Sequence, residues 1–338
     1  MPRAVVAGPA GERLTPDERA LLLDRPCAGF ILFQRNCREP SQVVDLTAEL
    51  RALYPGRWVP ILIDHEGGRV QRMKPPMWPA RPAAGALGAL PSAERRRAAR
   101  LWAQLLAADL VALGIDVDCV PVLDVGRPET TAAIGRRAFA DDPGIVAELG
   151  LLVIEVLQAS GVAPVIKHLP GHGRARVDTH HELARLECSL DTLRACDFEP
   201  FRACRHAPFA MTAHIVFEAL DPERPATHSR RVVQDVIRGE IGFEGILFSD
   251  DLSMNALEGP IETRARRSIE AGCDLALHCN GDFAEMRAVL AAAPPLAADR
   301  FERLQASCPP RVAPLDEAVM RAWARELDGL LEPVAGIA

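Results

Sequence analysis

Three stretches of the chain place carboxylates and histidines close together, and these residue types can move protons and stabilise a developing positive charge. The stretches are residues 64–72, 167–180 and 249–254. Asp178 and His180 are separated by one residue, so in an extended segment both side chains point to the same side. A histidine with an ordinary pKa of about 6.5 suits proton transfer near neutral pH, and a neighbouring carboxylate can hold its ring in one tautomer.

Each of these stretches follows a short apolar run, and eight such runs occur along the chain. They cover residues 4–7, 29–33, 59–63, 115–121, 162–166, 209–213, 245–248 and 273–277. The runs are rich in Val, Ile, Leu and Phe without polar alternation, as expected of strands that are buried on both faces. Helices are predicted at residues 16–23, 41–53, 91–113, 143–160, 190–206, 229–240, 262–271, 283–292 and 315–331.

Strands that alternate with helices in this way predict a parallel sheet closed into a barrel. We therefore expect an α/β fold, a single (β/α)₈ TIM barrel with extra C-terminal helices. The 338 residues suit such a barrel, which typically needs about 250 residues plus insertions. No linker rich in Gly or Ser and no break in composition divides the chain, so we expect one domain over residues 1–338.

The active site of such a barrel forms at the carboxyl ends of its strands. The positions that follow the predicted strands include a strongly polar set: Asp64, Arg72, Asp124, Lys167, His168, His172, Asp178, His180, His214, Asp250 and Asp251. Charged groups at the mouth of an apolar barrel need either partners or a substrate. The clustering therefore indicates a binding or catalytic site at this end.

Six segments carry a resemblance to a known family. They are residues 63–72 (IDHEGGRVQR), 121–126 (PVLDVG), 134–137 (IGRR), 167–180 (KHLPGHGRARVDTH), 213–215 (AHI) and 248–254 (FSDDLSM). In order and spacing they resemble the β-N-acetylglucosaminidases of glycoside hydrolase family 3 that act in bacterial peptidoglycan recycling. The resemblance covers nearly the whole barrel, and the segment at residues 167–180 is its most specific part.

The resemblance implies a retaining exo-hydrolase that removes terminal β-N-acetylglucosamine from muropeptides carrying 1,6-anhydro-N-acetylmuramic acid. It implies Asp250 as the nucleophile, His180 as the general acid/base and Asp178 as the carboxylate that supports His180. It implies sugar contacts at Asp64, Arg72, Arg137, Lys167 and His168. A carboxylate nucleophile suits the oxocarbenium-like transition state of glycoside hydrolysis. No cofactor and no metal are implied.

The sequence departs from the family pattern at three positions. His65 stands where many relatives carry glutamine, Arg136 replaces a common glutamate, and Ala138 replaces a common serine. These residues flank the implied sugar ligands without replacing them. They therefore bear on the detailed geometry of the site and leave the implied chemistry intact.

Other readings of the same residues stay open at this stage. Asp64, His168, His172, His180 and His214 would suffice as ligands of a zinc hydrolase. The same barrel would also suit a β-glucosidase or β-xylosidase, or a non-catalytic sugar-binding regulatory protein. Taken alone, Asp250 or Asp251 could cap the following helix, and Asp64 could form an ion pair with Arg72.

Composition narrows the class of partner. A formal net charge of −7 argues against nucleic acid, and the lack of an apolar stretch of about 20 residues argues against a membrane span. The nine cysteines contain no Cys-x-x-Cys pair, which favours reduced thiols, and the N-terminus lacks a signal-peptide core. We expect a cytoplasmic protein, a monomer, whose partner is a small-molecule sugar.

Overall fold

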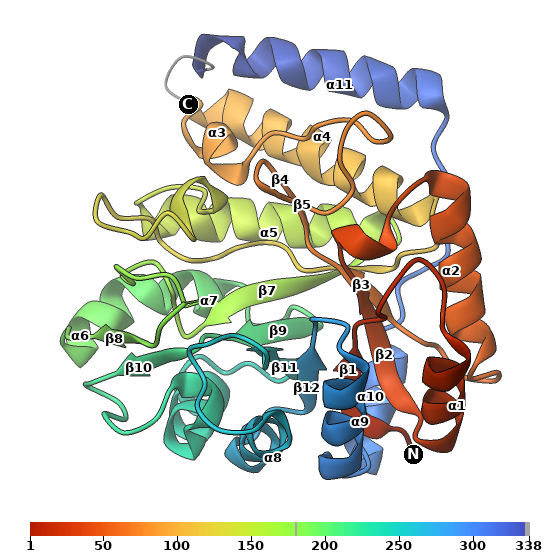
Figure 1. Ribbon diagram of the computed structural model, residues 1–338. Helices are drawn as coiled ribbons and strands as arrows, with labels where there is room; N and C mark the ends of the chain where they lie inside the picture. The colour runs from red at the N-terminus through yellow and green to blue at the C-terminus, as the bar shows by residue number, and fades with distance from the viewer. Residues whose placement is uncertain (180, 335–338) are drawn as a thin grey trace.

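The computed structural model describes residues 1–179 and 181–334, and a closed barrel of parallel strands forms its centre (Figure 1). In order around the barrel the strands are β1 (Arg3–Ala7), β12 (Leu275–His278), β11 (Ile246–Asp251), β9 (Phe209–Thr212), β7 (Ala163–Leu169), β6 (Val117–Asp118), β3 (Ile61–Ile63) and β2 (Cys27–Leu32). Each corresponds to one of the predicted apolar runs. The predicted (β/α)₈ barrel is confirmed.

Helices surround the barrel (Figure 1). The longer ones are α1 (Pro16–Asp24), α2 (Pro40–Ala52), α4 (Ser92–Val111), α5 (Pro143–Ala159), α8 (Ile261–Ala271), α9 (Phe283–Ala292), α10 (Ala298–Ala306) and α11 (Glu317–Leu331). The C-terminal α11 packs against α4, and the Arg97 Nε atom lies 2.6 Å from Glu326 Oε1 across this contact. Within the described ranges no helix has the length and apolarity that a membrane crossing requires.

Strand residues alternate between two apolar clusters, which explains why the strands are apolar throughout. In β1, Val6 belongs to a cluster that fills the barrel interior, whereas Val5 packs with the surrounding helices. The interior cluster includes Phe209 and Phe248, whose ring centroids lie 5.5 Å apart. This apolar filling forms the floor of the polar end of the barrel.

Two strands, β7 and β11, continue three residues past their predicted carboxyl ends, and these extensions carry polar residues of the site. The fifth strand was predicted to end at residue 166, but β7 continues to Leu169 because its pairing with β9 continues to that residue. Lys167 and His168 are therefore strand residues. In the same way β11 includes Asp250 and Asp251. The barrel itself fixes the direction in which these side chains point.

Other elements differ from the prediction. The helix predicted at 190–206 is split into α6 (Leu190–Thr192), the π-helical η3 (Leu193–Asp197) and α7 (Glu199–Ala203), and most of the segment 229–240 forms the π-helix η5 (Val232–Glu240). The prediction missed α10 and several short elements: α3 (Ala84–Gly88), β4 (His65–Gly67), β5 (Val70–Gln71), β8 (Ala184–Leu186), β10 (Ile215–Phe217), η1 (Gln34–Asn36), η2 (Gly135–Arg137), η4 (Ala226–His228) and η6 (Glu332–Val334). Segments of two to five residues are too short for a periodic pattern to show.

Candidate active site

A cavity of about 180 Å³ lies at the carboxyl ends of the barrel strands. Its lining brings together most of the predicted site residues: Asp64, Arg72, Arg137, Lys167, His168 and Asp250. Apolar side chains, among them Met211, Met254 and Ile134, complete the wall. Asp178 is not part of this lining, and His180 lies outside the described residues.

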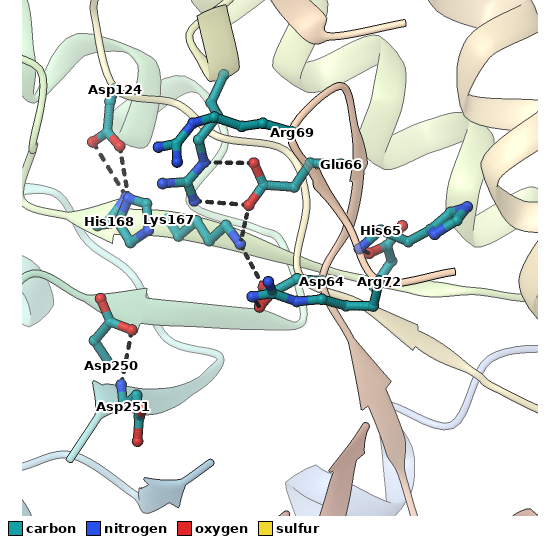
Figure 2. A network of polar contacts seen from close by, with 12 residues as sticks. Asp64, His65, Glu66, Arg69, Arg72, Asp124, Lys167, His168, Asp250 and Asp251 are labelled. Atoms are coloured by element: carbon teal, nitrogen blue, oxygen red, sulfur yellow. Dashed lines mark hydrogen bonds and ion pairs between the residues drawn. The ribbon is translucent and has the colours of Figure 1, made fainter. Parts of the chain in front are cut away.

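Five charged side chains form one continuous chain of ion pairs along one side of the cavity, most of it visible in Figure 2. Asp64 lies between Arg72 and Lys167, with Oδ2 2.7 Å from Arg72 Nη2 and Oδ1 2.8 Å from Lys167 Nζ. Glu66 continues the chain, because its Oε1 lies 2.6 Å from Lys167 Nζ. Arg137 closes it with two hydrogen bonds to Glu66, of 2.6 and 2.7 Å. Hereafter this set is called the ion-pair chain.

The ion-pair chain joins elements that are distant in sequence. Asp64 follows β3, Glu66 lies in the β4–β5 hairpin, Lys167 is on β7 and Arg137 is on η2. The Lys167 side chain is only 2% exposed, and an ammonium group taken out of water is costly unless it is paired. Its two carboxylate partners therefore hold these elements together as well as placing the charges.

Mutual pairing keeps these groups ionised. Burial by itself would raise the pKa of the Asp64 carboxyl, but the charges of Lys167 and Arg72 outweigh it and hold that pKa well below its usual range. Burial opposes ionisation of Glu66 too, yet Arg137 and Lys167 lower its pKa. Burial would lower the pKa of Lys167, and Asp64 and Glu66 raise it above its usual value instead. The cavity thus offers a fixed anion and fixed cations to a polar ligand.

Asp124 organises the histidines next to the ion-pair chain. Its fully buried carboxylate accepts a hydrogen bond from His168 Nδ1 at 2.7 Å and another from the backbone amide of His172 at 2.6 Å. Burial would raise the pKa of Asp124, but His168 and the hydrogen bonds lower it. Because His168 Nδ1 is engaged, Nε2 is the ring nitrogen left to meet a ligand.

Asp250 and Asp251 are neighbours on β11 with different surroundings, and their carboxylates point in opposite directions (Figure 2). The Asp251 carboxylate accepts hydrogen bonds from the Ser253 hydroxyl at 2.6 Å and from the Cys279 amide at 3.2 Å, which ties β11 to the end of β12. Asp250 accepts a hydrogen bond from the backbone amide of Asp251 at 2.8 Å. Both aspartates line the cavity, but the Asp251 carboxylate is held in a structural network by Ser253 and Cys279.

The segment before His180 reaches the site. Thr179 is buried, lines the cavity and places Oγ1 3.2 Å from Nε2 of the buried His172. Asp178 lies close enough to Arg69 for its charge to act on that guanidinium. The predicted pairing of Asp178 with His180 stays a prediction, since His180 lies outside the described residues.

Two residues that organise the site received no role of their own from the sequence. Glu66 bridges Lys167 and Arg137. Asp124, which the sequence placed only in the general polar set at the strand ends, orients His168. The spacing of Asp64 and Glu66 was a usable signal, because residues two apart in an extended segment share a face. No local pattern pointed to Asp124 as the partner of a histidine 44 residues away.

Three of the residues considered as zinc ligands, Asp64, His168 and His214, are engaged in other contacts. Asp64 pairs with Arg72 and Lys167, and His168 with Asp124. His214 donates from Nε2 to the Asp251 carbonyl at 2.9 Å. Among residues 1–179 and 181–334 no group of three or more His, Cys, Asp or Glu side chains is arranged to hold a metal ion.

Known proteins resemble this chain over most of its length. The Glycosyl hydrolase family 3 N terminal domain matches residues 4–303. A β-hexosaminidase of Stenotrophomonas maltophilia is 40% identical over 291 residues, which are 83% of this chain and 84% of that protein. A β-hexosaminidase of Alkalilimnicola ehrlichii is 41% identical over 285 residues, covering 82% and 80% respectively. The crystal structure of NagZ from Neisseria gonorrhoeae in complex with N-trifluoroacetyl-D-glucosamine has a TM-score of 0.89, 36% identity, and coverage of 98% of this chain and 99% of that one.

The ion-pair chain predicts a large stability effect at Glu66. We expect Glu66→Gln to lower the free energy of unfolding by about 3–5 kcal/mol, because Lys167 and Arg137 stay buried with one anion fewer. Urea unfolding at pH 7 measures this. The control is Glu326→Gln, which removes the same charge from an exposed pair with Arg97 and should change stability by about 1 kcal/mol or less. Equal effects of the two substitutions would contradict an energetic role for the buried chain.

His172 predicts a pH dependence of stability. Burial lowers its pKa to about 4, whereas an unfolded histidine titrates near 6.5. The unfolded chain therefore binds the proton more readily, so stability is complete above pH 6.5 and declines as the pH falls from 6.5 to 4. Between pH 7 and pH 5 the parent protein should lose about 2 kcal/mol more than a His172→Gln variant. Unfolding at both pH values, with the exposed His206→Gln as control, measures this; no difference between the parent and His172→Gln would refute it.

Proposed function

The chain belongs to glycosyl hydrolase family 3, and from that premise we propose that it is an exo-acting, retaining β-N-acetylglucosaminidase whose nucleophile is Asp250. Its activity class is that of a glycoside hydrolase of the β-hexosaminidase type, as in the relatives above. The proposed substrates are muropeptides of peptidoglycan recycling that carry 1,6-anhydro-N-acetylmuramic acid behind a terminal N-acetylglucosamine. The main support for this proposal is one small cavity whose wall contains Asp250 together with four members of the ion-pair chain, Asp64, Arg72, Arg137 and Lys167.

The cavity suits one sugar unit. Its volume of about 180 Å³ is below the range of about 300–1,000 Å³ that is usual for drug-sized ligands. Asp64 can accept hydrogen bonds from sugar hydroxyls, while Arg72, Arg137 and Lys167 donate, and charge-assisted hydrogen bonds of this kind are strong. Met211 and Met254 supply an apolar surface for the carbon faces of the ring. A cavity of this size favours removal of one terminal residue at a time.

The proposed reaction proceeds in two steps. The Asp250 carboxylate attacks the anomeric carbon, the glycosidic bond breaks, and the leaving oxygen takes a proton from the general acid. Water then attacks the same carbon, the bond to Asp250 breaks, and the proton of water returns to the general base. Two displacements at one carbon give net retention.

His180 takes the role of acid and base in this proposal, and Asp178 stabilises its imidazolium form. Thr179, the residue directly before His180, lines the cavity, which supports a site role for this segment. A carboxylate next to an acid/base histidine would fix its tautomer and favour its protonated form. The proposal needs no cofactor and no metal.

The proposal extends to the cell compartment and the oligomeric state. All nine cysteines are free thiols, and most are buried, which suits a reducing cytoplasm. The expected partner is the sugar substrate alone, bound by a monomer.

The test is hydrolysis of 4-nitrophenyl β-N-acetylglucosaminide beside the matching β-glucoside, with a chelator present and the released anomer followed by NMR. We expect turnover of the acetamido sugar, with the β-anomer released first. Preference for the plain glucoside would overturn the substrate, and loss of activity on chelation would overturn metal independence. No turnover of either sugar would favour a binding protein.

Asp250→Ala should lower turnover by about 10⁴-fold or more, because no carboxylate remains to capture the anomeric carbon. Binding of N-acetylglucosamine, measured by calorimetry, should persist, since the ion-pair chain is intact. Asp141→Ala, at an exposed position, serves as the control and should keep full turnover. Substantial residual turnover in Asp250→Ala would exclude Asp250 as the nucleophile.

His180→Ala should show a loss that depends on the leaving group. A general acid contributes about 10²–10⁴-fold when the leaving oxygen is basic and much less when it is an activated phenolate. The measurement compares kcat/KM for a 2,4-dinitrophenyl glycoside with that for a disaccharide. An equal loss for both substrates would rule out the acid role.

A further inference from the structure

The strand that carries Asp250, the proposed nucleophile, is paired unequally on its two sides. Its ladder with β9 ends at the pair Met211–Phe248, so Asp250 lies beyond that ladder. Its pairing with β12 continues further, to Asp251. Within the described residues, strand pairing therefore supports the end of β11 from the β12 side only.

The imidazole of His214 connects β11 to the β9 side where the ladder has ended. His214 is buried just after the end of β9, and its Nε2 atom lies 2.9 Å from the carbonyl oxygen of Asp251. A carbonyl oxygen only accepts hydrogen bonds, so Nε2 carries a proton and donates it. The other ring nitrogen, Nδ1, lies 2.7 Å from the hydroxyl oxygen of Thr227 on η4. One ring thus joins the segment after β9 to both β11 and η4.

The Thr227 hydroxyl selects the tautomer of this ring. Burial lowers the pKa of His214 and favours its neutral form, in which a protonated Nε2 leaves Nδ1 as an acceptor. Thr227 then donates its single hydroxyl proton to Nδ1. The Thr212 hydroxyl, 2.8 Å from that of Thr227, in turn donates to Thr227. The protons point in one direction, from Thr212 through Thr227 and His214 to the Asp251 carbonyl.

Loss of the Thr227 hydroxyl would disturb the end of β11 in either of two ways. If Nε2 kept its proton, Nδ1 would be a buried acceptor without this donor, which costs free energy. If the proton moved to Nδ1, the lone pair of Nε2 would face the lone pairs of the Asp251 carbonyl and repel it. The Ala213 carbonyl is a competing acceptor for the Thr227 proton, but it lies at 3.1 Å, further than Nδ1.

We propose that Thr227 is a positioning residue of the reaction: by fixing the tautomer of His214, its hydroxyl holds the end of β11 where Asp250 meets the anomeric carbon. This inference rests on the proposed function, in which Asp250 is the nucleophile. Neither Thr227 nor His214 lines the sugar cavity, so their effect reaches the substrate through the strand that carries Asp250. A nucleophile displaced by a fraction of an ångström to about 1 Å reacts much more slowly, even though the sugar still binds.

The kinetic experiment compares Thr227→Val, which keeps the shape of the side chain and removes the hydroxyl, with Thr227→Ser, which keeps the hydroxyl. The readouts are kcat/KM for 4-nitrophenyl β-N-acetylglucosaminide and, by calorimetry, the Kd of N-acetylglucosamine. The control is Thr47→Val. It removes another buried hydroxyl, one that donates to the Leu113 carbonyl at 2.8 Å and does not line the cavity.

We expect kcat/KM to fall about tenfold or more in Thr227→Val, and to stay within about twofold of the parent value in Thr227→Ser and Thr47→Val. The Kd of N-acetylglucosamine should stay within about twofold in all three variants, because the ion-pair chain is intact. Equal kcat/KM in the parent and Thr227→Val, equal losses in Thr227→Val and Thr227→Ser, or a parallel loss of sugar affinity would each overturn the inference while the proposed function stands.

Nitrogen NMR of the histidine rings in the parent protein at pH 7 tests the tautomer without relying on a variant or on turnover. We expect the ring of His214, assigned through its backbone resonances, to have a protonated Nε2 and an unprotonated, hydrogen-bonded Nδ1. A proton on Nδ1 overturns the inference whatever the kinetics show. A parent enzyme that hydrolyses no N-acetylglucosaminide overturns the proposed function, and this inference with it.

Discussion

The site depends on one buried ammonium group. Lys167 is removed from water on β7, and this is tolerated because Asp64 and Glu66 both contact Nζ, at 2.8 and 2.6 Å. These carboxylates come from the end of β3 and from the hairpin that follows it, so pairing the lysine fixes both segments against β7. Glu66 then places Arg137, whose element is far from β7 in sequence. The burial of this one ammonium group thus determines the position of most of the charged wall of the cavity.

Hydrogen-bonded carboxylates also position the backbone on the other sides of the cavity. Asp124 is buried and is satisfied by His168 and by the His172 amide, which fixes the start of the segment that leads to the predicted acid/base residue. Asp251 is satisfied by Ser253 and Cys279, which holds the end of β11 where Asp250 lies. In each case a carboxylate next to the cavity organises the backbone. The residue proposed to contact the ligand is the hydrogen-bond partner of that carboxylate, as for His168, or its neighbour in the chain, as for Asp250.

Separate residues for positioning the backbone and for contacting the ligand suit the proposed retaining glycosidase. In the proposed mechanism a rigid wall of fixed charges holds the hydroxyls of one sugar while Asp250, the proposed nucleophile on β11, meets the anomeric carbon. Preorganised groups of this kind need little rearrangement in the transition state. The apolar barrel filling beneath the cavity supports that rigidity.

The sequence by itself determined the barrel, because burial on both faces makes every strand a local apolar run, and it located Asp64, Lys167, His168 and Asp250 at strand ends. It did not reveal that β7 and β11 continue through the polar residues, since strand length depends on pairing with neighbours. Only the tertiary structure decided that Glu66 pairs with an arginine 71 residues away. Contacts between distant segments leave no periodic mark in the chain, and they decide which charges are neutralised and which remain for a ligand.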